Sequence, residues 1–333
     1  MEKTLSFEEV KSITQNVLAV REVGDHTYRF DRFTEAQYAI YGQTFYGGAH
    51  CAPTACFDFV YDGSLIKFDF LPVYHTSRAF VSFDLYADGV MEYTMYTYTN
   101  GEGQTMFEYS FPDRKKRRVQ IFFPFSAGVE IHNVRLDADA TFAPTPTAGR
   151  MKLLILGDSI THGYDARQAS LAYSTAVARY FDAVALNQAV GGYFFNADML
   201  DEDLPFAPDV ITVAYGTNDW GRCKQDSERY AKNSGAYIDK LCAMYPDAKI
   251  FGITPIWRAN LDKHPECMPF EKVYEILEGH YGRHKNVTII DGRRCVPHIR
   301  EVYTDGLHPN TVGQSLYAQA VISAMEQSGV KKA

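Results

Sequence analysis

The spacing of apolar residues changes at about residue 145, and this change divides the chain into two halves. From residue 28 to residue 139, short runs alternate apolar with polar residues and are rich in Phe, Tyr, Val and Thr. A period of two is typical of strands that bury one face. We expect strands at residues 56–61, 65–70, 80–86, 91–98 and 119–123. Because Asp62-Gly63 separates the first two runs, they are expected to pair as a β-hairpin, within an antiparallel β-sandwich or jelly roll.

The second half has apolar runs that alternate with helical patterns. These apolar runs end near Gly157, Gln188, Tyr215, Thr254 and Asp291. Helices are expected at residues 227–244, 269–280 and 311–327. Such alternation predicts a parallel sheet covered by helices on both faces. Since residues 142–149 hold two prolines and a glycine, they suit a linker, and we predict a β domain at residues 1–145 and an α/β domain at residues 150–330.

Ser159 follows the first apolar run of the second half, in the segment Gly157-Asp158-Ser159. Open α/β sheets bind their ligands at the carboxyl ends of the strands, so a serine at this position is a candidate nucleophile. The alternative is a serine that caps a helix or stabilises a turn, which is the commoner role of such triplets. A nucleophilic serine also needs a base and donors for the oxyanion.

Candidates for these partners occur in three further segments. Asp305 and His308, three residues apart in a terminal loop, suit a carboxylate that orients an imidazole base. Gly192 ends the loop after one apolar run, where a glycine lets a backbone N–H approach a substrate closely. Asn218 follows the next apolar run, and its amide is a neutral donor suited to an oxyanion. Each also has an ordinary interpretation, as a surface histidine, a turn glycine or a turn asparagine.

The order and spacing of these motifs resemble the SGNH (GDSL-type) hydrolase superfamily over residues 150–328. The resemblance implies Ser159 as nucleophile, His308 as base and Asp305 as its orienting carboxylate. It implies the Ser159 N–H, the Gly192 N–H and the Asn218 side chain as oxyanion donors, and a flavodoxin-like strand order 2-1-3-4-5. Ala189 stands where many members have glycine. A β-sandwich ahead of such a domain is similar to carbohydrate esterases that remove acetyl groups.

Composition and charge narrow the list of partners. The net charge of −8 argues against nucleic acid or an anionic membrane as the main partner. The one basic run, residues 114–118, is expected to be a solvated turn. No apolar run reaches the roughly 18 residues of a membrane span, and residues 1–9 do not form a signal peptide. The six cysteines show no metal-ligand spacing, so we expect a cytoplasmic protein without metal or cofactor, whose oligomeric state stays open.

Three functions remain open at this point. The favoured one is a serine esterase that removes O-acetyl groups from sugars or oligosaccharides. For this role Trp220, Trp257 and Arg258 are candidate substrate-binding residues, because an indole face suits a sugar ring and a guanidinium binds hydroxyls; ordinary packing is the alternative for each tryptophan. The second function is hydrolysis of lipid esters or acyl thioesters. A catalytically degenerate carbohydrate-binding protein is the third, and the intact Ser159, Asp305 and His308 set argues against it.

Overall fold

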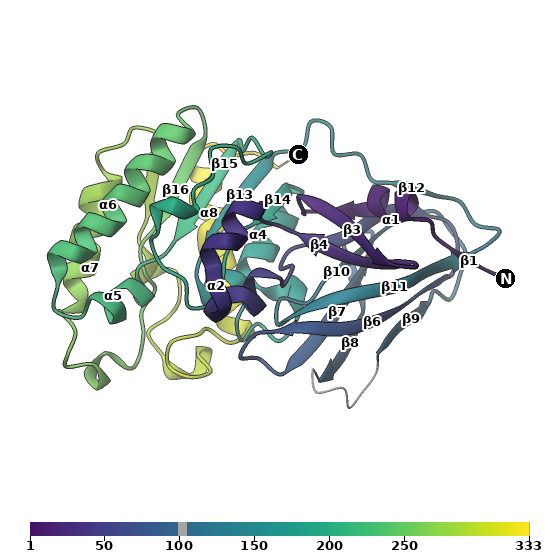
Figure 1. Ribbon diagram of the computed structural model, residues 1–333, viewed down its shortest axis with the longest axis horizontal. Helices are drawn as coiled ribbons and strands as arrows, with labels where there is room; N and C mark the ends of the chain where they lie inside the picture. The colour runs from purple at the N-terminus through teal and green to yellow at the C-terminus, as the bar shows by residue number, and fades with distance from the viewer. Residues whose placement is uncertain (99–104, 333) are drawn as a thin grey trace.

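The structure is a computed structural model that describes residues 1–98 and 105–332. We call residues 1–145 the β region and residues 150–330 the α/β region. Figure 1 shows the two regions side by side along the long axis, with α2 (Glu35–Ala49) between them. The fold class expected from the sequence, a β-sandwich joined to an α/β sheet, is confirmed.

The β region consists of two antiparallel sheets packed face to face. The first contains β3 (Ala19–Gly24), β4 (Thr27–Asp31), β11 (Ala127–Asp137), β6 (Leu65–His75) and β9 (Met106–Ser110), with β1 (Glu2–Thr4) beside β11. The second contains β12 (Phe142–Pro144), β5 (Cys56–Tyr61), β10 (Arg117–Phe122), β7 (Phe80–Ala87) and β8 (Val90–Tyr98), with β2 (Thr14–Gln15) beside β5. Aromatic side chains such as Phe57, Phe68 and Phe83 fill the space between the sheets. The alternation of the sequence therefore reflects one buried face on each sheet.

The hairpin expected at Asp62-Gly63 is wrong. β5 and β6 lie in different sheets, so this turn carries the chain from one sheet to the other. The turn is held by the Asp137 carboxylate, which accepts hydrogen bonds from the N–H groups of Ser64 (2.7 Å) and Leu65 (3.0 Å). A hairpin does form at Asp88-Gly89, between β7 and β8. Both of these residues have positive φ, +49° and +83°, as a type I′ turn requires.

The basic run at residues 114–118 is only in part the solvated turn that we expected: residues 114–116 are exposed and outside any strand, whereas Arg117 and Arg118 belong to β10. Arg117 begins β10 and is buried, with its guanidinium 4.0 Å from the centre of the Phe111 ring. Arg118 forms ion pairs with Asp58 (2.6 Å) in the β region and Asp182 (2.8 Å) in the α/β region. The prediction failed for these two residues because the nearby Phe111 ring packs against Arg117 and two carboxylates distant in sequence bind Arg118.

The β region also contains helices that the strand pattern did not predict. α1 (Phe7–Ile13) begins after Ser6 and α2 begins after Thr34. In each helix the cap side chain and the third helical residue, Glu9 or Gln37, bond each other's backbone N–H groups. This reciprocal capping box is readable in a sequence. Both capping boxes are therefore visible in the sequence, but the alternating apolar and polar residues of the neighbouring segments favoured strands.

The α/β region is a three-layer structure around a parallel sheet. The strand order is β14 (Val184–Asn187), β13 (Lys152–Gly157), β15 (Val210–Ala214), β16 (Lys249–Ile253) and β17 (Val287–Ile290), which confirms the order 2-1-3-4-5. The helices are α3 (Ser159–His162), α4 (Tyr173–Tyr180), α5 (Thr217–Cys223), α6 (Ser227–Met244), α7 (Phe270–Tyr281) and α8 (Thr311–Gln327).

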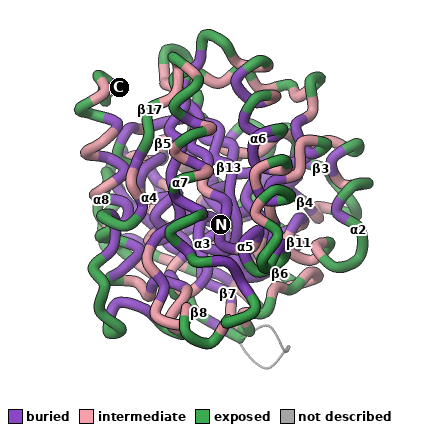
Figure 2. The backbone as a smooth tube through the Cα atoms, turned by 90° about the vertical axis from the view of Figure 1, so that its left-hand side faces the viewer, coloured by how far each residue is buried: buried purple, intermediate pink, exposed green. Residues whose placement is uncertain are grey.

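Alternate residues of β13 point to opposite faces of this sheet. Leu154 and Leu156 pack in the cluster that includes α6 and α7, whereas Leu153 and Ile155 pack in the cluster that includes α4 and α8. In Figure 2 the buried backbone runs through the middle of the molecule and the exposed backbone lies around it. The first cluster also contains Tyr41 from α2. The two regions thus share one hydrophobic core at this face.

All six cysteines are buried and free. In the part of the chain that the structure describes, no helix combines the length and the apolar character needed to cross a bilayer.

Candidate active site

Ser159 lies just after the end of β13, an inner strand of the parallel sheet. β13 ends at Gly157, and Ser159 is the first residue of α3, with 5% of its surface exposed. Asp158 caps this short helix, because its carboxylate accepts a hydrogen bond from the N–H of Ile160 (3.0 Å). Burial raises the pKa of Asp158 to about 6. Its side chain stabilises the turn that presents the serine, which is the role expected from the sequence.

His308 and Asp305 form a continuous hydrogen-bond chain with this serine. His308 Nε2 lies 2.8 Å from Ser159 Oγ, and His308 Nδ1 lies 2.7 Å from Asp305 Oδ2. Since the carboxylate can only accept, Nδ1 carries the proton and Nε2 offers its lone pair to the serine hydroxyl. The structure therefore brings together the three residues that we expected to act as nucleophile, base and orienting carboxylate.

Asp305 is held in its ionised form by several donors. Besides the imidazole, the backbone N–H groups of Leu307 (2.9 Å) and His308 (2.8 Å) donate to its Oδ1. Burial raises the pKa of this carboxyl, but the hydrogen bonds from His308 and Leu307 outweigh burial and bring the pKa well below its usual range. A carboxylate in this state keeps the imidazole in one tautomer and can stabilise an imidazolium.

Gly192 and Asn218 reach the same cleft from the ends of β14 and β15, the strands on either side of β13. Gly192 has a φ of +78°, a conformation that favours glycine, and it lies in the loop after β14. Asn218 is the second residue of α5, and its side-chain amide donates to the carbonyl of Tyr193 (2.9 Å). That bond orients the amide, and because an amide nitrogen has two hydrogens, one remains for a substrate.

The cleft around Ser159 has a volume of about 520 Å³ and is walled by both regions. The α/β region contributes Ser159, Tyr164, Gly191, Gly192, Asn218, Leu307 and His308. The β region contributes residues 43–45, 47 and 48 of α2 and residues 75–78, which follow β6. Most of this lining is polar or small. Neither β-region segment was identified from the sequence; the capping box at Thr34 and Gln37 would have revealed α2, whereas no local pattern marks residues 75–78.

Arg78 is the functional residue that the sequence analysis missed most clearly. Its guanidinium forms a two-bond ion pair with Asp165 (2.8 and 2.7 Å) and lies 4.7 Å from the centre of the Tyr164 ring. The same group lies 3.8 Å from Asp305 Oδ2. Asp165, Asp305 and His308 are grouped closely enough to hold a cation. Arg78 already provides the positive charge for that group, so the residues fit an ion pair better than a metal.

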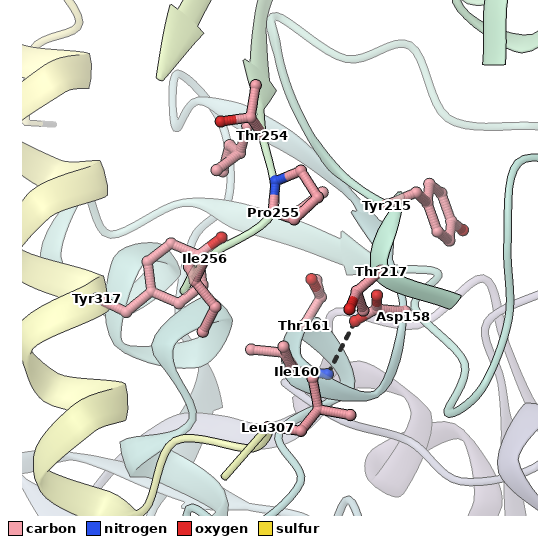
Figure 3. Close-up of a pocket in the computed structure, with 12 residues that line it drawn as sticks. Asp158, Ile160, Thr161, Tyr215, Thr217, Thr254, Pro255, Ile256, Leu307 and Tyr317 are labelled. Carbon is pink, nitrogen blue, oxygen red and sulfur yellow. Dashed lines mark hydrogen bonds between the residues drawn. The ribbon is translucent and has the colours of Figure 1, made fainter. Parts of the chain in front are cut away.

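A second, smaller cavity of about 20 Å³ is lined by Asp158 and Ile160, on either side of Ser159 in the sequence, and not by Ser159 itself. Figure 3 shows its walls, in which Ile160 and Leu307 face Ile256 and Tyr317, with Asp158 at the side. Its volume is that of about one water molecule. An acyl chain of many carbons does not fit in it.

The structure does not bring the three expected substrate-binding residues to the cleft. Trp220 is 2% exposed, and its indole N–H donates to the carbonyl of Met268 (2.7 Å). Arg258 is buried and donates to Thr217 Oγ1 (2.9 Å) and to the side chain of Asn260 (2.7 Å). Trp257 is half-buried and stacks on His298, with 5.3 Å between ring centres. The ordinary packing interpretation holds for these residues, because neighbouring loops cover the faces that a sugar would need.

Comparison with known families identifies the second half of the chain. Residues 155–316 match the GDSL-like Lipase/Acylhydrolase family. No curated protein matches the chain in sequence.

Several solved structures share the fold of the whole chain. A salicylyl-acyltransferase from a tetracycline biosynthetic pathway is 17% identical, with a TM-score of 0.84 over 99% of this chain and 98% of that one. A family two carbohydrate esterase from Cellvibrio japonicus is 18% identical, with a TM-score of 0.67 over 98% of each chain. An acetyl xylan esterase from Butyrivibrio proteoclasticus is 13% identical, with a TM-score of 0.63 over 98% of each chain. At these identities the similarity establishes the arrangement of both regions.

Proposed function

We propose that this chain, whose residues 155–316 form a GDSL-like lipase/acylhydrolase domain, is a serine esterase that removes O-acetyl groups from sugars or oligosaccharides. The observation that carries the proposal is the hydrogen-bond chain from Ser159 through His308 to Asp305, with links of 2.8 and 2.7 Å. Such a chain activates a hydroxyl group for attack on an acyl carbon.

The reaction follows from the position of each group. His308 Nε2 takes the proton of Ser159 as Oγ attacks the acetyl carbonyl carbon, and Asp305 stabilises the imidazolium. The N–H groups of Ser159 and Gly192 and the amide of Asn218 donate to the resulting oxyanion. The tetrahedral intermediate collapses, the C–O bond to the sugar breaks, and His308 gives its proton to the departing alkoxide. Water then attacks the acetyl-enzyme, with His308 as the base, and releases acetate and free Ser159.

The walls of the cleft favour a hydrophilic alcohol. Threonine, serine, glutamine, asparagine, arginine and histidine side chains line most of the space in front of Ser159. These groups can bond the hydroxyls of a sugar. The fold shared with carbohydrate esterases and with an acetyl xylan esterase supports the same assignment.

A substrate panel tests the proposal. Acetylated xylo- and manno-oligosaccharides should release acetate, and aryl acetate should be cleaved far faster than aryl octanoate at equal concentration. Each methylene that the site cannot accommodate costs about 1–3 kcal/mol. Equal or faster cleavage of octanoyl esters or acyl thioesters would transfer the assignment to the long-chain alternative with the same nucleophile. Binding of oligosaccharides without any ester cleavage would indicate the non-catalytic alternative.

A further inference from the structure

His162 is a buried histidine that the proposed reaction does not use. It is the last residue of α3, which begins with Ser159, and none of its surface is exposed. Its Nε2 lies 2.8 Å from the carbonyl oxygen of Phe125, in the β region. Its Nδ1 lies 3.2 Å from the backbone N of Gly191, next to Gly192. This histidine neither faces solvent nor lines the cleft.

The two partners determine the state of this imidazole. A carbonyl oxygen only accepts, so Nε2 must carry a hydrogen, and a backbone N–H only donates, so Nδ1 must be unprotonated. Burial, together with the nearby charge of Arg32, lowers the pKa of His162 well below its usual value. The side chain is therefore a neutral connector with one donor and one acceptor, each of which is used.

The loop that carries Gly192 is held at three places. The buried Arg32 guanidinium donates to the carbonyls of Asn187 (2.7 Å) and Ala189 (2.7 Å). The N–H of Val190 donates to the carbonyl of Gly157 (3.1 Å). His162 then holds the N–H of Gly191, directly before Gly192. Since paired glycines are conformationally permissive, the bond to His162 restrains the peptide groups that lead to the Gly192 N–H.

We propose that His162 is a positioning residue for oxyanion stabilisation and that the β region completes this site through the Phe125 carbonyl. The nucleophile and the residue that fixes the Gly192 loop then belong to the same turn of helix, α3. This arrangement sets the distance from Ser159 Oγ to the Gly192 N–H. The inference rests on the proposed ester hydrolysis, but the bonds that carry it do not depend on which ester is cleaved.

Two substitutions separate the two bonds of His162. The oxygen of an asparagine can occupy the place of Nδ1, so His162→Asn keeps the acceptor for Gly191 and loses the donor to Phe125. The amide nitrogen of a glutamine can occupy the place of Nε2, so His162→Gln keeps the donor to Phe125 and loses the acceptor. His284→Gln is the matched control, since His284 bonds Asp239 (2.9 Å) and does not line the cleft.

The kinetic experiment measures kcat and KM for an aryl acetate and the rate of labelling by a fluorophosphonate, whose phosphoryl oxygen needs the same donors. His162→Gln should lower kcat by about 10- to 100-fold with KM within about twofold, somewhat less than the loss of a whole donor. Labelling should slow in parallel. His162→Asn should lose about fivefold, and His284→Gln should match the wild type. Two outcomes would overturn the proposal. The first is an equal loss of kcat in both His162 variants that parallels the fall in their melting temperatures. The second is a wild-type kcat in His162→Gln.

Hydrogen–deuterium exchange of the segment 187–193 provides a readout that is independent of activity. Exchange should be faster in His162→Gln than in the wild type and close to the wild type in His162→Asn. An unchanged rate in His162→Gln would refute the positioning role even in an active enzyme. A wild type that neither cleaves esters nor reacts with the fluorophosphonate would instead refute the proposed function. If His162→Gln does not fold, the kcat of His162→Asn tests the proposal instead. A loss of kcat above about 100-fold in folded His162→Asn would overturn the proposal.

Discussion

The two walls of the cleft contribute in different ways. The α/β wall supplies the groups that we propose to react, Ser159, His308 and the donors Gly192 and Asn218, each at a strand end or in a loop beside one. The β wall supplies α2, the segment 75–78 and the backbone carbonyl that holds His162. The residues of the α/β wall belong to recognisable sequence motifs, whereas those of the β wall, Arg78 among them, are brought to the cleft by the packing of the two regions. Sequence motifs therefore identify the residues of the α/β wall but not those of the β wall.

The largest expected effect comes from the α/β wall. Ser159→Ala should keep the fold and lose about 10⁴-fold or more in turnover, because the members of a triad act as a unit. Hydrolysis of an aryl acetate and labelling by a fluorophosphonate measure this loss. Ser315→Ala, an exposed serine on α8, is the control and should behave as the wild type. Substantial turnover in Ser159→Ala would remove the distinction between the two walls.

The next effect concerns a donor on the same wall. Asn218→Ala should lower kcat by about 10²- to 10³-fold, the usual result of removing one oxyanion donor. The loss should appear in kcat because this contact strengthens as charge develops on the substrate. Steady-state kinetics on an aryl acetate distinguish the possibilities. A rise in KM alone would make Asn218 a binding residue.

A smaller effect is expected from the β wall. Arg78→Ala should lower kcat by about tenfold, because it leaves the Asp165 carboxylate unpaired 4.0 Å from His308 Nδ1. That carboxylate then competes with Asp305 for the imidazole N–H. Adding Asp165→Asn removes the competing charge and should restore part of the activity, which a double-mutant cycle would measure. Arg114→Ala, in an exposed ion pair with Asp139, is the control. A double variant no better than Arg78→Ala would show that Arg78 acts by another route.

The smallest effect concerns stability and its dependence on pH. Burial raises the pKa of Asp219 to about 7, against about 4 in an unfolded chain. Between these values the folded protein keeps a proton that the unfolded chain has lost, so this carboxyl lowers stability as the pH rises from about 4 to 7. Asp219→Asn removes the titration. Its melting temperature relative to the wild type should therefore rise by a few degrees from pH 5 to pH 8. A constant difference across that range would contradict the raised pKa.

The strand order 2-1-3-4-5 could be predicted only through the family resemblance, whereas the meeting of Ser159, Asp305 and His308 could be predicted from short local motifs. Ser159 follows a buried strand, and Asp305 and His308 share one loop. The hairpin at Asp62-Gly63 failed because a turn dipeptide reverses the chain without specifying which sheet receives the next strand. The ion pair of Arg78 with Asp165 joins the two regions, and its partners are 87 residues apart in the sequence. No pattern of residue spacing therefore predicts it.

The prediction that Trp220 and Trp257 bind substrate failed for a related reason. A position after a strand end suggested that Trp220 overhangs the nucleophile, but the ring contacts Phe270 of α7, at 5.1 Å between ring centres. Whether an aromatic side chain that follows a strand end faces solvent depends on the residues that pack against it. For Trp220 these residues lie about 50 positions away in the sequence. Two missed helices had a readable signal, the capping boxes Ser6–Glu9 of α1 and Thr34–Gln37 of α2.

Arg32 has a consequence for how the protein is made. Its guanidinium is fully buried and donates to the carbonyls of Gly48 and Cys51 from the first half and of Asn187 and Ala189 from the second. Arg32 leaves the ribosome 155 residues before Asn187. At translation rates of about 5–20 residues per second, about 8–30 seconds pass between the synthesis of Arg32 and that of its acceptors Asn187 and Ala189. During that interval only the carbonyls of Gly48 and Cys51 are available to Arg32, and water solvates the rest of the guanidinium, so its bonds between the two halves form only after the α/β region is synthesised.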